Sequence, residues 1–407
     1  MRIIDICPQL PFPLVTGGKQ SIYYALKSLA KRGHFIHLAC LMEGGDGMWV
    51  SELEKTFSIH VVASKQKPTV VGALASLTRR TPYQVSRFHE PKLLEDCREL
   101  LRTSAFDIVQ AEGIHAAYYA LALGEEFGIP SVLRIHDVMS LNMARVIRHT
   151  RNPAMRLWLA FDVQRVRRYE RNAYVRAGIS LPVSDAERNV LLKISPGARC
   201  DVIPPGIDLD EFAPQGLDEM PNTVLWVGAL GHAPNRDSFW WFYKEIVPLV
   251  IDRYPDVRIQ VAGTGMPEGI QSLRHPNVEV LGLVADIRQA MARAQVCVVP
   301  LRIGSGVRIK LLEMFAMGRA VVSTSVGAEG LGVTHDEHLL IADTPEQFAK
   351  EVVGLLRDNA RRARLGAEAR AHVTRQYSWE RVADLFEAVY RSLVSDPAKP
   401  TKDNLSI

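Results

Sequence analysis

The sequence has few cysteines and no long apolar run, and both features narrow the class of protein. Its 407 residues include five cysteines, Cys7, Cys40, Cys97, Cys200 and Cys297. Their odd number and wide spacing predict no disulfide framework and no metal site, so we expect reduced thiols in a cytoplasmic protein. The apolar runs are too short to span a bilayer, and the residues after Met1 are strand-like rather than typical of a signal peptide.

The common nucleotide-binding and nucleophilic motifs are also missing. The stretches Gly263–Gly265 and Gly304–Gly306 lack the third glycine of a dinucleotide fingerprint, and no Walker A sequence occurs. A nicotinamide or flavin dehydrogenase and a P-loop enzyme are therefore not expected. No Ser-His-Asp spacing, reactive cysteine context or run of carboxylates is present, so we predict no metal and no covalent nucleophile of these types.

Acidic residues are scarce in one part of the chain. Residues 1–205 carry 27 Lys and Arg against 19 Asp and Glu, whereas residues 206–407 carry 22 against 26. Nine arginines lie between positions 145 and 176, where Asp162 and Glu170 are the only acids. This asymmetry indicates an anionic partner for the first half, with a solvated helix face as the alternative.

Strand-like and helix-like segments alternate along the whole chain. The strand-like segments are residues 2–7, 34–41, 106–110, 131–135, 179–183, 224–227, 258–262, 278–281, 296–300 and 320–324, and the clearest helices are 20–32 and 237–253. Such alternation is typical of parallel sheets with helices on both faces. It predicts the α/β class, with two Rossmann-like domains whose ligands bind at the carboxyl ends of strands.

A proline-rich stretch separates the two alternating regions. Residues 195–221 contain five prolines and three glycines, which is typical of a linker. We therefore predict a first domain at residues 1–205 and a second at 206–378. A last helix at about 379–394 is expected to pack back on the first domain.

The glycine turn Gly304-Ser305-Gly306 and the helix after it form the most informative segment. Backbone amides in such a turn approach a ligand closely, and the helix directs unpaired N–H groups at the same space. A diphosphate is the expected occupant, with Arg308 and Lys310 in the first turn and Glu313 one turn further on, within reach of a ribose.

Candidate groups in the first half follow strand-like segments. Gly17 and Gly18 precede the first helix, where a phosphate or sugar oxygen could dock, although a tight turn would also explain them. Glu112 and His115 follow the segment 106–110, and His136 follows 131–135. We treat these three as candidate acid–base or acceptor-side groups, with ordinary structural roles as the alternative.

Together these motifs resemble the retaining glycosyltransferases of family 4, which have two facing Rossmann-like domains and an interdomain cleft, the GT-B fold. The resemblance covers nearly the whole chain: an opening that runs from Met1 through Gly17-Gly18 to Gly33-His34, a hinge sequence at 202–212, and the helix and strand at 311–323. Pro205 stands where the family usually has Asn.

The resemblance implies roles for individual residues, with some departures. Glu313 matches the second glutamate of the family's Glu-x7-Glu motif, which holds the nucleotide ribose, whereas Ser305 stands at the first. The segment 228–237 does not match the family's Arg and Lys, so Arg308 and Lys310 are expected to grip the diphosphate. Gly282 and Leu283 resemble the loop that meets the base. Gln110-Ala111-Glu112 stands where the family has His-x-His, and His115 is a possible substitute.

The resemblance implies an enzyme that transfers a sugar from a nucleotide diphosphate to a glycan or lipid-linked acceptor, in cell-surface polysaccharide or glycolipid synthesis. We expect no metal or other cofactor, no nucleic-acid partner, and peripheral contact with anionic membrane on the cytoplasmic face. The alternatives are a nucleotide-sugar 2-epimerase and a non-catalytic sugar-nucleotide-binding partner. Base, sugar, acceptor and linkage depend on pocket contacts that the sequence does not reveal.

Overall fold

The computed structural model describes residues 1–14, 16–44, 46–64, 72, 76, 81–150, 152–304 and 306–395. The chain forms two compact units. Unit 1 comprises Met1–Pro204 together with the C-terminal stretch from Val382, and unit 2 comprises Pro205–Arg381. Within the described residues, no helix has the length and apolar character that crossing a membrane requires.

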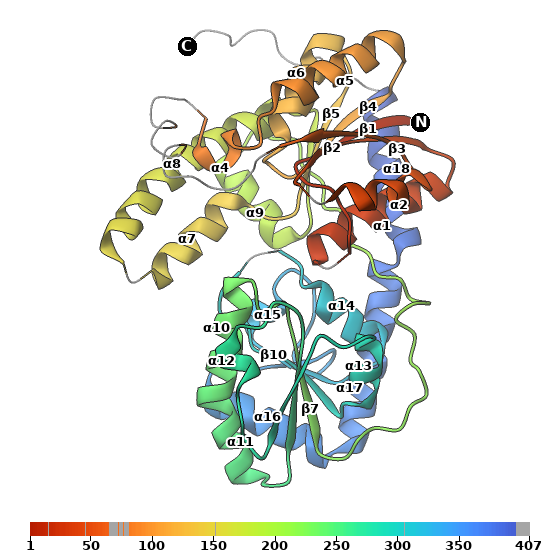
Figure 1. Cartoon of the computed structure of the whole chain (residues 1–407). Helices are drawn as coiled ribbons and strands as arrows, with labels where there is room; N and C mark the ends of the chain where they lie inside the picture. The colour runs from red at the N-terminus through yellow and green to blue at the C-terminus, as the bar shows by residue number, and fades with distance from the viewer. Residues whose placement is uncertain are drawn as a thin grey trace. The chain divides into compact units, whose positions relative to one another are not determined.

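Unit 1 is built on a six-stranded parallel sheet in the order β3-β2-β1-β4-β5-β6 (Figure 1). Its strands are β1 (Arg2–Cys7), β2 (Phe35–Met42), β3 (Ser58–Ala63), β4 (Ile108–Glu112), β5 (Ser131–Ile135) and β6 (Ile179–Pro182). Its helices are α1 (Gly17–Lys31), α2 (Val50–Glu54), α4 (Tyr83–Ser86), α5 (Pro91–Thr103), α6 (Ala117–Phe127), α7 (Met139–His149), α8 (Pro153–Arg176) and α9 (Asp185–Ile194), with a 3₁₀ turn at Asp46–Trp49.

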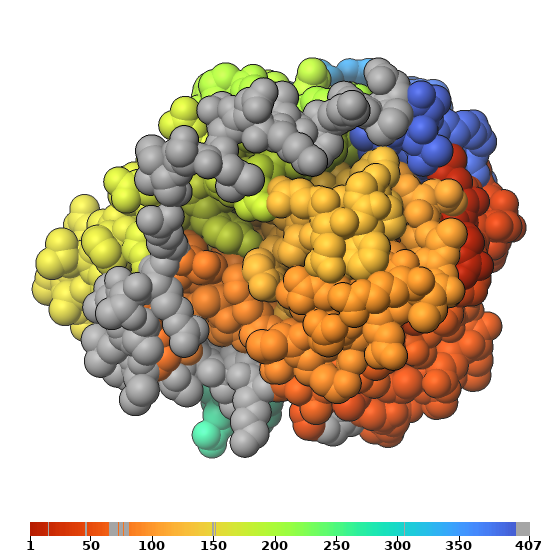
Figure 2. Space-filling view, turned by 90° about the horizontal axis from the view of Figure 1, so that it is seen from above, coloured from red at the N-terminus to blue at the C-terminus, as the bar shows by residue number. Residues whose placement is uncertain are grey.

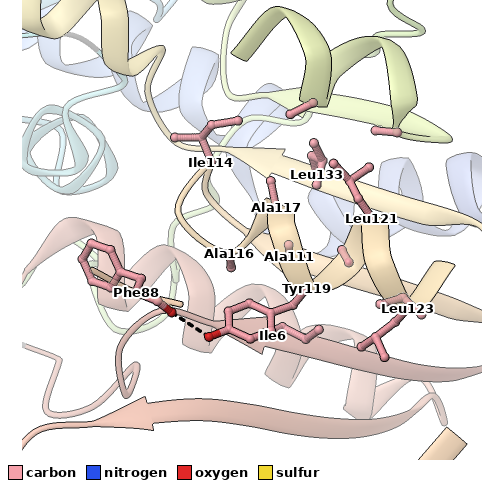
Figure 3. Close-up of a cluster of buried hydrophobic side chains, with 14 of the residues drawn as sticks. Ile6, Phe88, Ala111, Ile114, Ala116, Ala117, Tyr119, Leu121, Leu123 and Leu133 are labelled. Carbon is pink, nitrogen blue, oxygen red and sulfur yellow. Dashed lines mark hydrogen bonds between the residues drawn. The ribbon is translucent and has the colours of Figure 1, made fainter. Parts of the chain in front are cut away.

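One face of this sheet carries the apolar core of unit 1. Side chains on alternate strand positions point to the same face. Ile4 and Ile6 of β1, Ala111 of β4 and Leu133 of β5 are fully buried there, against residues of α5, α6 and α8. Figure 3 shows part of this cluster, in which the Tyr119 hydroxyl donates to the backbone oxygen of Phe88 at 2.6 Å.

The opposite face of the same strands contains a row of buried polar side chains. Asp5 of β1, Gln110 and Glu112 of β4 and Arg134 of β5 all occupy the alternate positions, and all are buried. The strand register places Asp5 opposite Gln110, and Glu112 opposite Arg134. A parallel sheet buried on both faces normally has apolar side chains on both, so this polar row requires internal partners.

Helix α18 (Trp379–Ser395) supplies part of that cover. From Val382 onward it counts with unit 1, and Val382, Phe386 and Tyr390 are buried. The Arg134 guanidinium carbon lies 5.2 Å from the centre of the Phe386 ring. Tyr390 reaches Gln110, 280 positions away in the sequence.

Unit 2 repeats the architecture with a second six-stranded parallel sheet, ordered β12-β11-β10-β7-β8-β9. Its strands are β7 (Thr223–Val227), β8 (Arg258–Ala262), β9 (Val278–Gly282), β10 (Val296–Val299), β11 (Val321–Ser323) and β12 (Leu340–Ile341). Its helices are α10 (Ala233–Trp241), α11 (Val247–Arg253), α12 (Glu268–Gln271), α13 (Ile287–Arg293), α14 (Ile309–Ala316), α15 (Ser325–Ala328), α16 (Pro345–Arg357) and α17 (Asn359–Tyr377). The α/β class and the two parallel sheets predicted from the alternation are thereby confirmed.

Several boundaries differ from those expected. Helix α1 begins at Gly17 rather than Gln20, because Thr16 caps it by accepting from the Lys19 amide at 3.4 Å. The helix expected at 237–253 begins at Ala233 and contains a π-helical turn at Phe242–Ile246. Strands β3 and β12 were not predicted; each lies at the edge of its own sheet, where short strands are usual.

Candidate active site

A buried hydrogen-bond network links the polar row of unit 1. The Gln110 amide nitrogen donates to Asp5 Oδ2 at 2.6 Å and to Glu112 Oε1 at 3.1 Å. Its amide oxygen accepts from the Tyr390 hydroxyl at 2.6 Å. Gln110 therefore joins the two carboxyl groups of Asp5 and Glu112 to the C-terminal helix. Its amide orientation is fixed, because the nitrogen must donate to both carboxyl groups and the oxygen must accept from Tyr390.

Glu112 is the charged centre of this network. It is the last residue of β4, not a residue of the following loop as expected, because β4 extends two residues beyond the predicted end. Arg134 Nη1 lies 3.4 Å from Glu112 Oε1, and His136 Nε2 lies 2.5 Å from Glu112 Oε2. Arg134 also donates to the backbone oxygen and the hydroxyl of Ser21 in α1. The structure thus brings together two of the predicted residues, Glu112 and His136.

The two carboxyls of the network have opposite protonation tendencies. Burial disfavours the charged form of Glu112, but the charges of Arg134 and His136 outweigh it, so the pKa of Glu112 lies below its usual value. Burial, and then repulsion by Glu112, raise the pKa of Asp5 well above its usual value. Of the two carboxyls, Glu112 is therefore the one whose charged form is favoured, and it holds the His136 ring by the contact to Nε2.

His115 occupies a different environment. It lies on the loop between β4 and α6, and its ring packs against Phe88 with centroids 4.8 Å apart. Burial, and then repulsion by Arg87 and His136, lower the pKa of His115 to about 4. It is consequently neutral near pH 7, so it can accept a proton only weakly.

Gly17 and Gly18 form the first turn of α1 rather than a turn before it. A Cβ added to Gly18 would meet no atom within 4 Å, so close packing does not explain the glycine. The first-turn amides of this helix are the groups that a phosphate or sugar oxygen would contact.

In unit 2 the glycine turn lies between β10 and α14, as predicted. Gly304 has φ of 131° and Gly306 has φ of 78°, which are conformations that favour glycine. A Cβ on Gly304 would lie 2.9 Å from Nη2 of Arg308, so the guanidinium lies directly over the turn. Arg308 is the N-cap residue of α14, and Ser305 lies outside the described residues.

Lys310 joins α14 to the end of the first strand of this sheet. Its ammonium donates to the Val227 backbone oxygen at 2.9 Å and to Asn235 Oδ1 at 3.3 Å, and it lies 5.4 Å from the centre of the Trp226 ring. Burial, and then repulsion from Arg308, lower the pKa of Lys310 to about 7. The site therefore holds its cation close to the balance between the charged and neutral forms.

Glu313 lies one turn further along α14 and is buried. Burial, and then repulsion from Glu211, raise the pKa of Glu313 to about 7, with Lys310 acting in the opposite direction. Lys310 and Glu313 are three residues apart on one helix face, and each charge favours the charged form of the other.

The remaining donor-side candidates lie at the end of β9. Gly282 has φ of 70°, and its backbone oxygen accepts from the Gly263 amide at 2.8 Å. The next residue, Leu283, is 77% exposed. An apolar side chain this exposed beside the carboxyl end of a strand is accessible for packing against a ligand.

Four residues that hold the Glu112 network of unit 1 and Lys310 of unit 2 in place were not predicted from the sequence. Asp5 and Arg134 resemble ordinary strand residues until the register pairs them, and Tyr390 is distant in sequence. Asn235 follows Pro234 at the start of α10, and this proline–asparagine helix start was the available signal. Within the described residues, no three His, Cys, Asp or Glu side chains gather as a metal ion would require.

Comparison with known families gives two matches that together cover most of the chain. Residues 15–211 match "Glycosyltransferase Family 4", and residues 221–358 match "Glycosyl transferases group 1". The two matches divide at the linker between the two sheets.

Curated relatives are distant but consistent with these families. The chain is 22% identical to an uncharacterised 44.6 kDa protein in the cps region of Klebsiella pneumoniae, over 96% of this chain and 99% of that protein. It is 29% identical to the phosphatidyl-myo-inositol mannosyltransferase of Mycobacterium tuberculosis, over 54% of this chain and 61% of that protein. The chain thus spans about three fifths of the length of that mannosyltransferase.

Solved structures share the fold. The structure matches HepE from Anabaena in complex with UDP with a TM-score of 0.72 at 16% identity, over 97% of this chain and all of that one. Sucrose-phosphate synthase from Thermosynechococcus elongatus matches with the same TM-score, identity and coverage. These structural similarities agree with the GT-B fold that the sequence resemblance implies. From the two family matches, the chain belongs to the group 1 and family 4 glycosyltransferases and is a glycosyltransferase.

Proposed function

We propose that this glycosyltransferase moves a sugar from a nucleotide diphosphate donor to a glycan or lipid-linked acceptor, with retention at the anomeric carbon, in cell-surface polysaccharide or glycolipid synthesis. The observation that carries the proposal is the cation arrangement in unit 2. Arg308 lies over the Gly304 turn, and Lys310 is held by the Val227 carbonyl and Asn235. Both cations stand at the start of α14, where the backbone amides also favour an anion.

The donor side has a separate group for each part of the ligand. The diphosphate would contact the turn amides, Arg308 and Lys310. Glu313, one turn along, would accept hydrogen bonds from the ribose hydroxyls, and Gly282 with Leu283 would support the base. Relatives support a nucleotide donor in general: HepE has been solved with UDP and with UDP-glucose, and one mannosyltransferase relative is named as GDP-mannose-dependent.

Charge development explains why these groups would accelerate transfer. As the bond from the sugar to the diphosphate breaks, negative charge grows on the leaving oxygen. A bound diphosphate would favour the charged form of Lys310, whose pKa near 7 leaves it easily protonated. We propose that these cations neutralise the leaving group and that no metal ion is needed.

We assign the acceptor side to unit 1. We assign Glu112 and His136 there, because they form a 2.5 Å pair at the carboxyl ends of β4 and β5. Gly17 and Gly18 would contact the phosphate or sugar from the start of α1. His115, packed against Phe88 with a lowered pKa, would line the site rather than carry a proton.

The acceptor class rests on the relatives and on charge. Mannosyltransferase relatives are named for phosphatidyl-myo-inositol, a lipid. The basic first half of this chain suits an anionic acceptor or the surface that contains it. We therefore propose a lipid-linked or polysaccharide acceptor reached at the cytoplasmic face of a membrane.

The test measures nucleotide release from a panel of nucleotide sugars, with and without a lipid extract as acceptor. Lys310→Ala and Glu313→Ala are expected to lose at least tenfold in turnover. Lys350→Ala and Glu346→Ala, exposed residues of α16, are the matched controls and should retain wild-type turnover. Near-wild-type rates in both site variants would refute the donor assignment, and donor consumption with no acceptor would indicate isomerisation or hydrolysis instead.

A further inference from the structure

Helix α8 presents a regular outward row of side chains. Asn152 starts the helix by accepting from the Met155 amide at 3.1 Å, and Pro153 occupies the first turn. Its inward face buries Val163, Val166 and Tyr174. The opposite face, at steps of three or four residues, is what we call the outward row: Leu157, Phe161, Gln164, Arg168, Arg171 and Val175.

Large apolar side chains of this row are open to solvent. Leu157 is 75% exposed, and Phe161 is 52% exposed although it is aromatic. Figure 1 shows α7 and α8 side by side, extending away from the sheet of unit 1. In the view of Figure 2 the yellow residues of these helices stand at the left edge. Single exposed apolar residues are common, but aligned ones on a projecting helix mark a contact surface.

The charge on this face has one sign. The two acids of α8, Asp162 and Glu170, are both buried on the inward side. Asp162 pairs with Arg165 at 3.3 Å, and Glu170 accepts from the Ser140 amide at 3.2 Å. Arg168 and Arg171 are exposed, and no carboxylate of the described residues forms an ion pair with either. The outward row is therefore apolar and cationic, with no acid in it.

We propose that the outward row of α8 docks on an anionic lipid surface. Leu157 and Phe161 would enter the boundary between headgroups and acyl chains, while Arg168 and Arg171 would contact lipid phosphates. A nucleic acid would use the arginines but leave Leu157 in water, so the combination favours lipid.

The position of the outward row relates membrane docking to the acceptor site in unit 1, and this step rests on the proposed function. Helix α7 begins at Met139, three residues after His136 at the end of β5. It packs against α8 along its length. A docked α8 would therefore keep the carboxyl end of β5 near the surface that holds a lipid-linked acceptor.

The experiment is co-sedimentation of the full chain with vesicles, with no donor or acceptor present. We expect binding to vesicles of phosphatidylcholine mixed with phosphatidylglycerol, weakened by salt, and little binding to phosphatidylcholine alone. Leu157→Ser with Phe161→Ser should lower the affinity about tenfold or more. Arg168→Gln with Arg171→Gln should lower it roughly twentyfold.

Matched controls keep the test specific. Met48→Ser removes another apolar side chain of unit 1 that is 69% exposed, and Arg375→Gln with Arg381→Gln removes two exposed cations elsewhere; neither should change binding. Far-ultraviolet circular dichroism checks that each variant is folded.

Three outcomes would overturn the proposal. Wild-type protein could ignore the phosphatidylglycerol content, or the row variants could bind vesicles as wild type does. Alternatively, the row variants could change the molar mass measured by light scattering and leave vesicle binding intact, which would make this face a self-association surface. Because no substrate is present, failure here leaves the proposed transfer reaction to be judged by its own assay.

Discussion

The buried pair of Arg134 and Glu112 gives a stability prediction whose size follows from its surroundings. Both side chains have no solvent exposure, and the nearest atoms are 3.4 Å apart. Removing one partner of a buried pair costs up to about 3–5 kcal/mol, from which the remaining neighbours, His136 beside Glu112 and Asp5 near Arg134, subtract a part. We therefore expect Arg134→Met and Glu112→Gln each to lower the free energy of unfolding by this amount at pH 7.

The double variant separates the interaction energy between the two charges from the energy of burying each charge. Arg134→Met combined with Glu112→Gln removes both charges, so neither is left alone. Its loss should be smaller than the sum of the single losses by about 2–3 kcal/mol, a coupling at the upper end for neighbouring residues.

The assay is urea unfolding of the full chain followed by circular dichroism, and the matched control is a surface pair. Arg176 and Glu125 of unit 1 lie 2.7 Å apart but are both more than two fifths exposed, so their coupling should be below about 1 kcal/mol. Additive losses for Arg134 and Glu112, or single losses under about 1 kcal/mol, would refute the reasoning.

The same pair predicts a pH dependence. The pKa of Glu112 is lower in the folded protein, so its contribution to stability is present above the unfolded value of about 4.3. The contribution is lost as the pH falls from there through the folded value. Coupling that is unchanged at every pH between 7 and the pH at which wild type unfolds in acid would contradict the assignment of Glu112 as the charged carboxylate.

Three further predictions concern other buried groups. Burial raises the pKa of Glu170 to about 7, so wild type loses stability as the pH rises from about 4.3 to 7. In urea titrations at pH 8, the free energy of unfolding of Glu170→Gln should therefore be roughly 2–3 kcal/mol larger than that of wild type. Equal stability at pH 8 would contradict this. Lys310 has a pKa of about 7, so calorimetric affinity for UDP or GDP should fall as the pH rises through 7, and in Lys310→Arg it should not; a flat wild-type profile would argue against contact with the phosphates. A Cβ on Gly366 would lie 2.1 Å from the Gly318 backbone oxygen, so Gly366→Ala should lower the free energy of unfolding measured by calorimetry by about 2–3 kcal/mol. As the control, a Cβ on Gly354 would have no atom nearer than 3.8 Å, so Gly354→Ala should be neutral or stabilising by up to about 1 kcal/mol.

Local patterns in the sequence were sufficient to predict the segment from β10 to α14. The glycine turn, the strand before it and the helix after it involve residues within about twenty positions of one another, and chain connectivity alone places Arg308 and Lys310 at the start of that helix. Most strand positions followed from apolar alternation for the same reason, because burial on a sheet face repeats every second residue.

Boundaries were less well determined. Glu112 was expected in a loop, yet it ends β4, since strand length is set by pairing with β5 and not by the residue itself. Likewise, Thr16 moves the start of α1 to Gly17 by capping the helix, although two glycines are poor helix formers.

By itself the sequence determined the α/β class, the alternation that gives two parallel sheets, and the glycine turn with its two cations, because each depends on neighbouring residues. Only the tertiary structure decided which charges meet. Strand register places Arg134 opposite Glu112, α18 brings Tyr390 to Gln110, and folding of unit 2 brings Lys310 to the Val227 carbonyl, 83 positions away. The physical reason is that the protonation state of a buried group depends on the partners that replace its water, and those partners come from distant parts of the chain.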